Sequence, residues 1–198
     1  MLACSDSRVP VEIVFDQTLG DLFVVRVAGQ ALDSSVLASI EYALENLDVH
    51  LVVVLGHEGC GAIAAVLNTP LGETTGSPHL DALLGDIRPR LARVAAPPPA
   101  TKSVLRESAA NAVGVARDLP LRSAVVRARL AAGRLVVQPA LYHLGSGRVE
   151  WLEEAAGEAA AQSLDAVSSG GGDEAPFFGE LRVADIILVK SVAPDGGV

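Results

Sequence analysis

His50-Leu51-Val52-Val53-Val54-Leu55-Gly56 is a continuous apolar run after its first residue, and His57-Glu58-Gly59-Cys60-Gly61 follows it directly. Apolar runs of this length are typical of strands that are buried on both faces of a parallel sheet. A helix is expected immediately afterwards, through Ala62-Ile63-Ala64-Ala65-Val66-Leu67. The stretch therefore predicts a buried strand that leads into a helix, as in α/β proteins.

The rest of the chain continues this alternation. Further strands are expected at 21–29, from 134 to 137 and at 149–152, the last after a turn at 145–147. Further helices are expected at three places: from a cap at Ser34 through Leu44, at 79–95, and over about 101–132. The last of these is expected to be interrupted at Pro120. Residues 68–78 are expected to form a loop. The prediction is a single α/β domain in which helices flank a mainly parallel central β-sheet.

Residues 153–198 differ in composition from the part before them and are expected to form a C-terminal tail. An Ala-rich helix is expected at 153–167, followed by a Gly/Ser linker at 168–173. A late apolar element, formed by 177–179 and 186–189, is expected to be either an extra edge strand or a contact between subunits.

The composition limits the classes of function. The 198 residues are half apolar, and 24 acidic against 15 basic residues give a net charge of -9. An acidic chain without a basic stripe is a poor candidate for binding the phosphate backbone of nucleic acids. No apolar run reaches the roughly 18 residues that a membrane helix needs. We therefore expect a soluble, cytoplasmic protein with no nucleic-acid or membrane partner.

Both cysteines of the chain, Cys4 and Cys60, lie where an apolar run ends. Two isolated cysteines are usually small buried hydrophobes, and a disulfide is disfavoured by the low cysteine count and the absence of a signal peptide. With His57 they would instead make a catalytic zinc set, in which a fourth position stays open for water. Ligands of α/β sheets bind at the carboxyl ends of the strands, where these three residues could converge.

Four segments carry a more specific signal: Ala3-Cys4-Ser5-Asp6-Ser7-Arg8-Val9-Pro10, then 20–29, 39–43 and 54–62. In their order and spacing they resemble the β-class carbonic anhydrases. The strong match covers residues 2–67, and a weaker one continues to about Leu152. The resemblance implies that residues 1–152 form the zinc domain of such an enzyme.

The resemblance also implies a ligand set and a mechanism. Zn²⁺ would be held by Cys4, His57 and Cys60, and zinc-bound hydroxide would attack carbon dioxide to give bicarbonate in a reversible reaction. Asp6 and Arg8 would form a catalytic dyad, in which Asp6 accepts the hydrogen bond of the hydroxide. When Arg8 releases it, Asp6 can become a conditional fourth zinc ligand. The backbone N–H of Gly61 would donate to a substrate oxygen.

The spacing of these residues is compatible with one site. Cys4, Asp6 and Arg8 are two positions apart, so an extended segment can point them to the same side. His57 and Cys60 are three apart, so one helical turn would place both on one face. Arg8 beside Asp6 should lower the pKa of that carboxyl group and keep it ionised.

The chain also departs from the family pattern. Only Met1, Leu2 and Ala3 precede Cys4, so the family's N-terminal arm, which embraces the partner subunit, has no counterpart. Gln30 stands where Asn is more usual, and Pro139 where the late strand often has Gly, a substitution that suits an edge strand or a bulge. We expect an intact zinc site with impaired stability, dimerisation or turnover.

Two other functions use the same residues. One is hydrolysis of carbonyl sulfide or carbon disulfide, and the other is a weakly active zinc-binding regulatory module. In each case the family implies a homodimer or a higher homo-oligomer. The remaining candidates are expected to have surface or packing roles: His50, His79 and His143, the arginines of a solvated helix face (Arg88, Arg90 and Arg93), and Trp151.

Overall fold

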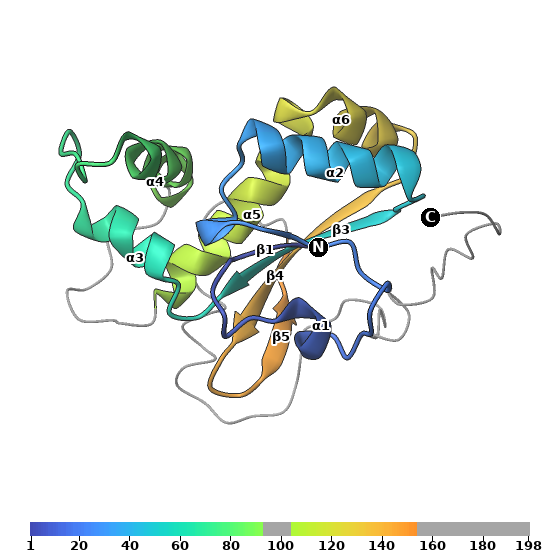
Figure 1. The fold of residues 1–198 in the computed structure, drawn as a ribbon, viewed down its shortest axis with the longest axis horizontal. Helices are drawn as coiled ribbons and strands as arrows, with labels where there is room; N and C mark the ends of the chain where they lie inside the picture. Colours follow the sequence, from blue (N-terminus) through green and yellow to red (C-terminus); the bar gives the residue numbers. More distant parts are fainter. Residues whose placement is uncertain (93–103, 154–198) are drawn as a thin grey trace.

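The computed structural model describes residues 1–92 and 104–153, which form a five-stranded sheet with helices around it (Figure 1). Neighbouring strands are parallel, except that the last two pair antiparallel as a hairpin. The spatial order is β2 (Val25–Arg26), β1 (Leu2–Ala3), β3 (Leu51–His57), β4 (Val136–His143) and β5 (Arg148–Trp151). The predicted single α/β domain with a mainly parallel sheet is confirmed. The predictions for the tail beyond residue 153 lie outside the described residues.

β3 is the centre of the core, because residues 52–57 are all buried. Successive side chains of a strand point to opposite faces of the sheet. Val52 and Val54 accordingly pack against α2 (Ser34–Asn46), α5 (Leu105–Arg122) and α6 (Ala124–Ala131). Val53 and Leu55 pack on the other face, in a cluster that includes the start of α1 (Val11–Val14). The apolar run therefore is the doubly buried strand that it predicted.

Two further helices lie beyond the carboxyl end of β3. They are α3 (Gly61–Asn68) and α4 (Pro78–Leu91), drawn in green apart from α2 and α6 in Figure 1. Their apolar side chains form a separate cluster that also contains Cys4 and Cys60. Across residues 1–92 and 104–153, no helix combines the length and the apolar character that a bilayer-spanning helix needs.

Three predictions about the boundaries of helices and strands were wrong. The strand expected at 21–29 shrinks to β2, because β1 offers it only two paired positions, and residues 28–30 turn away as the 3-10 helix η1 (Ala28–Gln30). Asp33 rather than Ser34 caps α2, with its side chain accepting from the N–H of Val36 at 2.8 Å. The break expected at Pro120 lies at Ser123, which caps α6. Proline fixes a helical φ and removes only one N–H, so α5 continues for two residues beyond it.

Pro139 lies inside β4, a strand with neighbours on both sides, rather than in an edge strand. Its carbonyl accepts from the N–H of Leu152 at 3.0 Å. In an antiparallel pair such residues exchange two hydrogen bonds, so a residue with a backbone N–H at position 139 would donate it to the carbonyl of Leu152. Proline lacks that N–H. The side chain of Gln138 replaces that donor, because its Nε2 lies 2.8 Å from the carbonyl oxygen of Leu152. The ladder therefore tolerates proline at this position.

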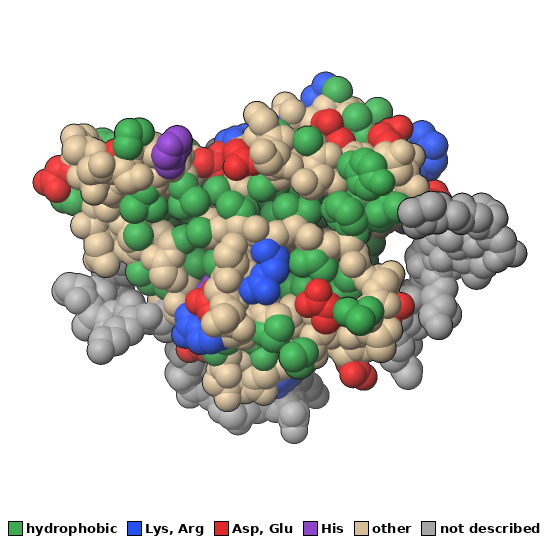
Figure 2. All heavy atoms as spheres, viewed as in Figure 1, with side chains coloured by type: hydrophobic (Ala, Val, Ile, Leu, Met, Phe, Trp, Pro, Cys, Tyr) green, Lys and Arg blue, Asp and Glu red, His purple; other side chains and the backbone are tan. Residues whose placement is uncertain are grey.

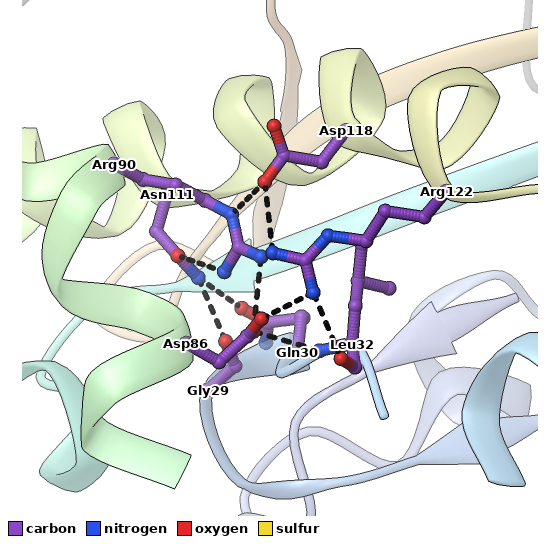
Figure 3. A network of polar contacts seen from close by, with 8 residues as sticks. All are labelled: Gly29, Gln30, Leu32, Asp86, Arg90, Asn111, Asp118 and Arg122. Atoms are coloured by element: carbon purple, nitrogen blue, oxygen red, sulfur yellow. Dashed lines mark hydrogen bonds and ion pairs between the residues drawn. The ribbon is translucent and has the colours of Figure 1, made fainter. Parts of the chain in front are cut away.

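Arg90 does not belong to a solvated helix face, because it is only 6% exposed. Its guanidinium group donates to Asp86 at 2.9 Å and to Asp118 at 2.8 Å, and so joins α4 to α5 (Figure 3). A buried arginine is tolerated when carboxylates pair with it and satisfy its donors. Charge patterning along α4 alone could not reveal this, since both the carboxylate on α5 and the burial depend on tertiary packing.

Arg90→Met is expected to lower the free energy of unfolding by about 3 kcal/mol, because it removes the buried cation from two partly buried carboxylates and leaves them only the more exposed Arg122. Urea unfolding at pH 7 measures this loss. The matched control is Arg129→Met, whose Nε lies 3.7 Å from a more exposed partner, Glu45. We expect that control to lose less than about 1 kcal/mol. Equal losses in the two variants would contradict a structural role for the Arg90 pairs.

Candidate metal centre

Cys4, His57 and Cys60 meet at one edge of the sheet. Cys4 follows β1 and His57 ends β3, and because these strands are parallel neighbours their carboxyl ends lie together. All three side chains are buried, and one potential ligand atom from each lies within 4.8 Å of the others. The two sulfur atoms are 3.9 Å apart, and both cysteines are free thiols rather than a disulfide.

The segment between His57 and Cys60 is a turn rather than the helical turn that the spacing suggested. Gly59 has a φ of 64°, in the left-handed region that favours glycine, and Cys60 is the N-terminal cap of α3 with extended backbone angles. The N–H of Glu58 donates to the carbonyl of Tyr142 at 3.0 Å, which ties the turn to β4. This turn brings the sulfur of Cys60 back towards the end of β3.

The imidazole of His57 is arranged as a metal ligand. Its Nδ1 lies 2.9 Å from the carbonyl oxygen of Glu58, and since a carbonyl can only accept, Nδ1 carries the proton. In this tautomer of the imidazole Nε2 carries the free lone pair, and it is buried without a hydrogen-bond partner among the described residues. A backbone carbonyl that fixes the tautomer in this way is usual for histidines that bind metals. The orphaned nitrogen fits a metal ion.

The two neighbouring thiols differ in acidity, because their pKa values are shifted in opposite directions. The pKa of Cys4 is lowered to about 4, chiefly by the hydrogen bond with Cys60, with smaller contributions from His57 and the N–H of Gly29 and with burial acting in the opposite direction. The same hydrogen bond, together with burial, raises the pKa of Cys60. Because zinc binds thiolates, a preformed anion at Cys4 beside the unpartnered Nε2 of His57 is a suitable donor set for it.

Asp6 and Arg8 form a close ion pair beside this cluster. The Nε and Nη2 atoms of Arg8 lie 2.9 and 2.6 Å from the two carboxylate oxygens, and the backbone N–H of Arg8 adds a third bond at 3.0 Å. Nη2 also donates to the carbonyl of Gly59 at 3.1 Å. The guanidinium group holds the pKa of Asp6 well below its usual range. One carboxylate oxygen lies 4.0 Å from Nε2 of His57, so the ionised group borders the ligands.

Sequence reasoning missed two groups that support Cys4. Arg26 donates to the carbonyl of Cys4 at 2.9 Å and to that of Asp6 at 2.5 Å, and so fixes the extended segment between them. The N–H of Gly29 donates to the Cys4 sulfur at 3.4 Å. A charged residue inside the apolar run 22–28 was the available signal for Arg26.

The comparison with protein families decides the identity. The model of the family described as "Carbonic anhydrase" matches residues 1–149. The chain belongs to the carbonic anhydrase family.

Individual relatives agree with this assignment. The chain is 40% identical over 162 residues to a carbonic anhydrase of Mycolicibacterium smegmatis, covering 76% of this chain and 72% of that protein. It is 32% identical over 162 residues to one of Pseudomonas aeruginosa, covering 78% and 72%.

Solved structures place the chain in the β class. The β-carbonic anhydrase CafA of Aspergillus fumigatus is 30% identical with a TM-score of 0.66, over 82% of this chain and 78% of that one. One of two tetrameric β-carbonic anhydrases from Sordaria macrospora is 26% identical with the same TM-score, over 76% and 78%. Members of this class are carbonate dehydratases, and zinc is their cofactor.

Gly61 is the first residue of α3 in this carbonic anhydrase, directly after Cys60. A Cβ atom added there would meet no atom within 4 Å, so the space beside it is open. The first N–H groups of a helix have no partner within the helix. These features are compatible with the expected contact to a substrate oxygen, which stays a prediction.

Gly29→Ala is expected to destabilise this carbonic anhydrase by about 3 kcal/mol, through both backbone strain and overpacking. Gly29 has a φ of 62°, and an added Cβ would lie 2.6 Å from Cδ1 of Ile87 and 3.0 Å from Cβ of Ala62.

The matched control is Gly20→Ala, which has a φ of 93° but open space around it, and we expect it to cost about 1 kcal/mol. Thermal and urea unfolding of both variants separates strain from contact. A larger loss at Gly20 would contradict the close packing of the Gly29 turn.

Proposed function

We propose that this chain catalyses the reversible hydration of carbon dioxide to bicarbonate, with zinc bound by Cys4, His57 and Cys60. The observation that carries this proposal is the buried, unpartnered Nε2 of His57 beside two free thiols. Two thiolates and one imidazole are the protein ligands of a catalytic zinc that keeps a fourth position open. When bound, zinc acts as a Lewis acid that makes hydroxide available near pH 7.

In this proposal Asp6 orients the nucleophile. Its ionised carboxylate has no proton to donate, so it accepts the hydrogen bond of the attacking hydroxide and directs the oxygen lone pair at the carbon. Arg8 holds Asp6 through two side-chain hydrogen bonds and keeps it charged. If Arg8 releases it, Asp6 could move onto the metal as a fourth ligand, since one of its oxygens lies 4.0 Å from Nε2 of His57.

The reaction needs no further covalent group from the protein. The hydroxide oxygen forms a bond to carbon, one carbon–oxygen double bond becomes a single bond, and the negative charge develops on the substrate oxygen. The N–H of Gly61 is proposed to donate to that oxygen, because such donors stabilise charge that develops in the transition state. The proton lost from water passes to solvent.

The decisive experiment is stopped-flow hydration of carbon dioxide by protein with measured zinc content. We expect acceleration that disappears when a chelator removes the zinc and returns when zinc is added. The same preparation is assayed for sulfide release from carbonyl sulfide and carbon disulfide, where we expect little turnover. One zinc per chain without acceleration, or faster turnover of the sulfur compounds, would overturn the proposal.

We also propose that residues 1–152 form the catalytic unit and that the chain self-associates. The family match ends at residue 149, which supports the first part. Figure 2 shows apolar side chains gathered in a band across one face. Independently of that view, several large apolar side chains of the described residues are exposed, among them Tyr42, Leu19 and Leu71. Size-exclusion chromatography with light scattering is expected to give a dimer or larger species, and a clean monomer would contradict this.

The cytoplasm is the proposed location. Both cysteines are free thiols, and the chain has no other cysteine. Reduced thiols persist in the cytosol, whereas oxidising compartments favour disulfides.

A further inference from the structure

A polar network lies behind the turn that contacts Cys4. Figure 3 shows side chains from α4 and α5 converging on residues 29–32. The N–H of Leu32 donates to Asp86 at 2.8 Å, and the carbonyl of Leu32 accepts from Arg122 at 3.0 Å. Arg122 also pairs with Asp86 at 2.5 Å. The far end of the turn is thus fixed by two helices that come much later in the chain.

Asn111 is the member of this network that contacts Gly29 itself. It is fully buried on α5, and its Nδ2 lies 2.7 Å from the carbonyl oxygen of Gly29 and 3.3 Å from Oε1 of Gln30. Its Oδ1 lies 3.4 Å from Nη1 of Arg90. A guanidinium group can only donate, so Arg90 determines which way the amide faces. The amide nitrogen must therefore point at the turn.

The turn needs such support because its backbone is unfavourable. Gly29 and Gln30 follow each other with φ values of 62° and 52°, both in the left-handed region, and Gln30 is not glycine. Residues held in this region persist when the surrounding structure fixes them. Gly29 donates its N–H to the Cys4 sulfur while its carbonyl accepts from Asn111. One residue thus connects Asn111 to the sulfur.

The fold makes room for this arrangement at Gly114. A Cβ added there would lie 2.8 Å from both Cγ and Cδ of Arg90, so only glycine lets Arg90 cross α5. Glycine inside a helix lowers its stability, and a packing reason usually accounts for it. Here that reason is access of the guanidinium group to Asn111.

We propose that Asn111 is a positioning residue of the metal centre, which acts through Gly29 by aiming its N–H at the Cys4 sulfur. This inference rests on the proposed zinc site. Hydrogen bonds to a ligating thiolate tune its donor strength, and groups outside the ligand set commonly change metal affinity by about 10- to 100-fold. The Asn111 amide sets the N–H···S contact and touches no ligand directly.

The test is Asn111→Asp, which keeps the size and the contact with Arg90 but removes the donor to Gly29. We expect zinc affinity, measured by competition with a chelator at constant pH, to fall about tenfold. We also expect the thiolate-to-metal charge-transfer band of the cobalt-substituted protein to shift. The control is Ser123→Ala, another buried polar residue, which bonds to Glu41 at 2.6 Å and caps α6.

The outcomes separate positioning from general stability. A shifted cobalt band in Asn111→Asp, with an unchanged band in Ser123→Ala, supports the proposal. Bands and affinities that match the parent, or that change equally in both variants, overturn it. If Asn111→Asp does not fold, Gly114→Ala is measured in its place, because the added Cβ would displace Arg90 from Asn111. The same changes in cobalt band and zinc affinity, relative to Ser123→Ala, then support or overturn the proposal. A parent protein that binds no metal would overturn the zinc site together with this inference.

Discussion

Cys60→Ser is expected to eliminate tight zinc binding and to reduce carbon dioxide hydration to the rate without enzyme. Cys60 supplies one of the two sulfur atoms of the candidate centre, and a serine hydroxyl does not provide the thiolate that zinc prefers. The remaining pair, Cys4 and His57, is too small a set for stable tetrahedral binding. Zinc content by mass spectrometry and stopped-flow hydration measure the two effects on one preparation.

The thermal stability of the same variant should not depend on added zinc. A ligand that binds only the folded state stabilises it by roughly 4 kcal/mol at a thousand times its dissociation constant. Added zinc should therefore raise the melting temperature of the metal-free parent and leave that of Cys60→Ser unchanged. A variant that keeps one zinc per chain and parental turnover would contradict the assignment of Cys60.

Asp6→Asn is expected to lower kcat/KM about 100-fold while zinc content stays at the parental level. The amide is nearly isosteric, so the segment around it should keep its shape. It carries no charge, and it loses the oxygen pair that now accepts from Arg8 at 2.9 and 2.6 Å. Asp6 is proposed to position the nucleophile, and a misplacement of about 1 Å at a reacting centre can cost about 100-fold in rate. Loss of zinc together with activity would instead indicate a role in metal binding.

Arg8→Gln tests whether Arg8 acts through Asp6. If it does, the double variant should be about as slow as Asp6→Asn alone, because residues in one contact are not additive. A double variant whose loss in kcat/KM equals the product of the two single losses would contradict a dyad. Metal content is measured for all three variants, so that loss of zinc is not mistaken for loss of the dyad.

The pH dependence follows from the lowered pKa of Asp6, for which the Arg8 side-chain hydrogen bond is the main cause. A carboxyl group whose pKa is depressed on folding adds stability above its unfolded pKa of about 3.9, and this stability is lost as the pH falls further. Asp6 is therefore ionised throughout the range above about pH 5. The kcat/KM profile of the parent should therefore show no inflection from Asp6 down to about pH 5, and an inflection above that pH that Asp6→Asn removes would contradict this.

Much of the site was predictable because the residues that carry it are close to strand ends in the sequence. The apolar run before His57 predicted β3, and the carboxyl-end rule for parallel strands predicted that Cys4 would lie near Cys60. The short ion pair of Asp6 and Arg8 was predictable for the same reason, since it needs only an extended segment. The turn after β3 was not predicted, because Gly59 has a positive φ that ends the strand in a turn instead of the expected helical geometry.

The buried arginine and the Gly29 turn required the tertiary structure. Nothing near Arg90 in the sequence indicates burial, because Asp118 and Asn111 come from α5, more than twenty residues later. The shortening of the strand expected at 21–29 likewise depends on the length of its partner, β1.

The sequence by itself determined the fold class, the family and the three candidate ligands, since apolar periodicity and local motifs are encoded in neighbouring residues. Only the tertiary structure decided how Cys4 is supported, through Arg26, Gly29 and the network behind them. The physical reason is that hydrogen bonds and burial depend on which distant segments pack together. That packing follows from the whole core rather than from any one segment.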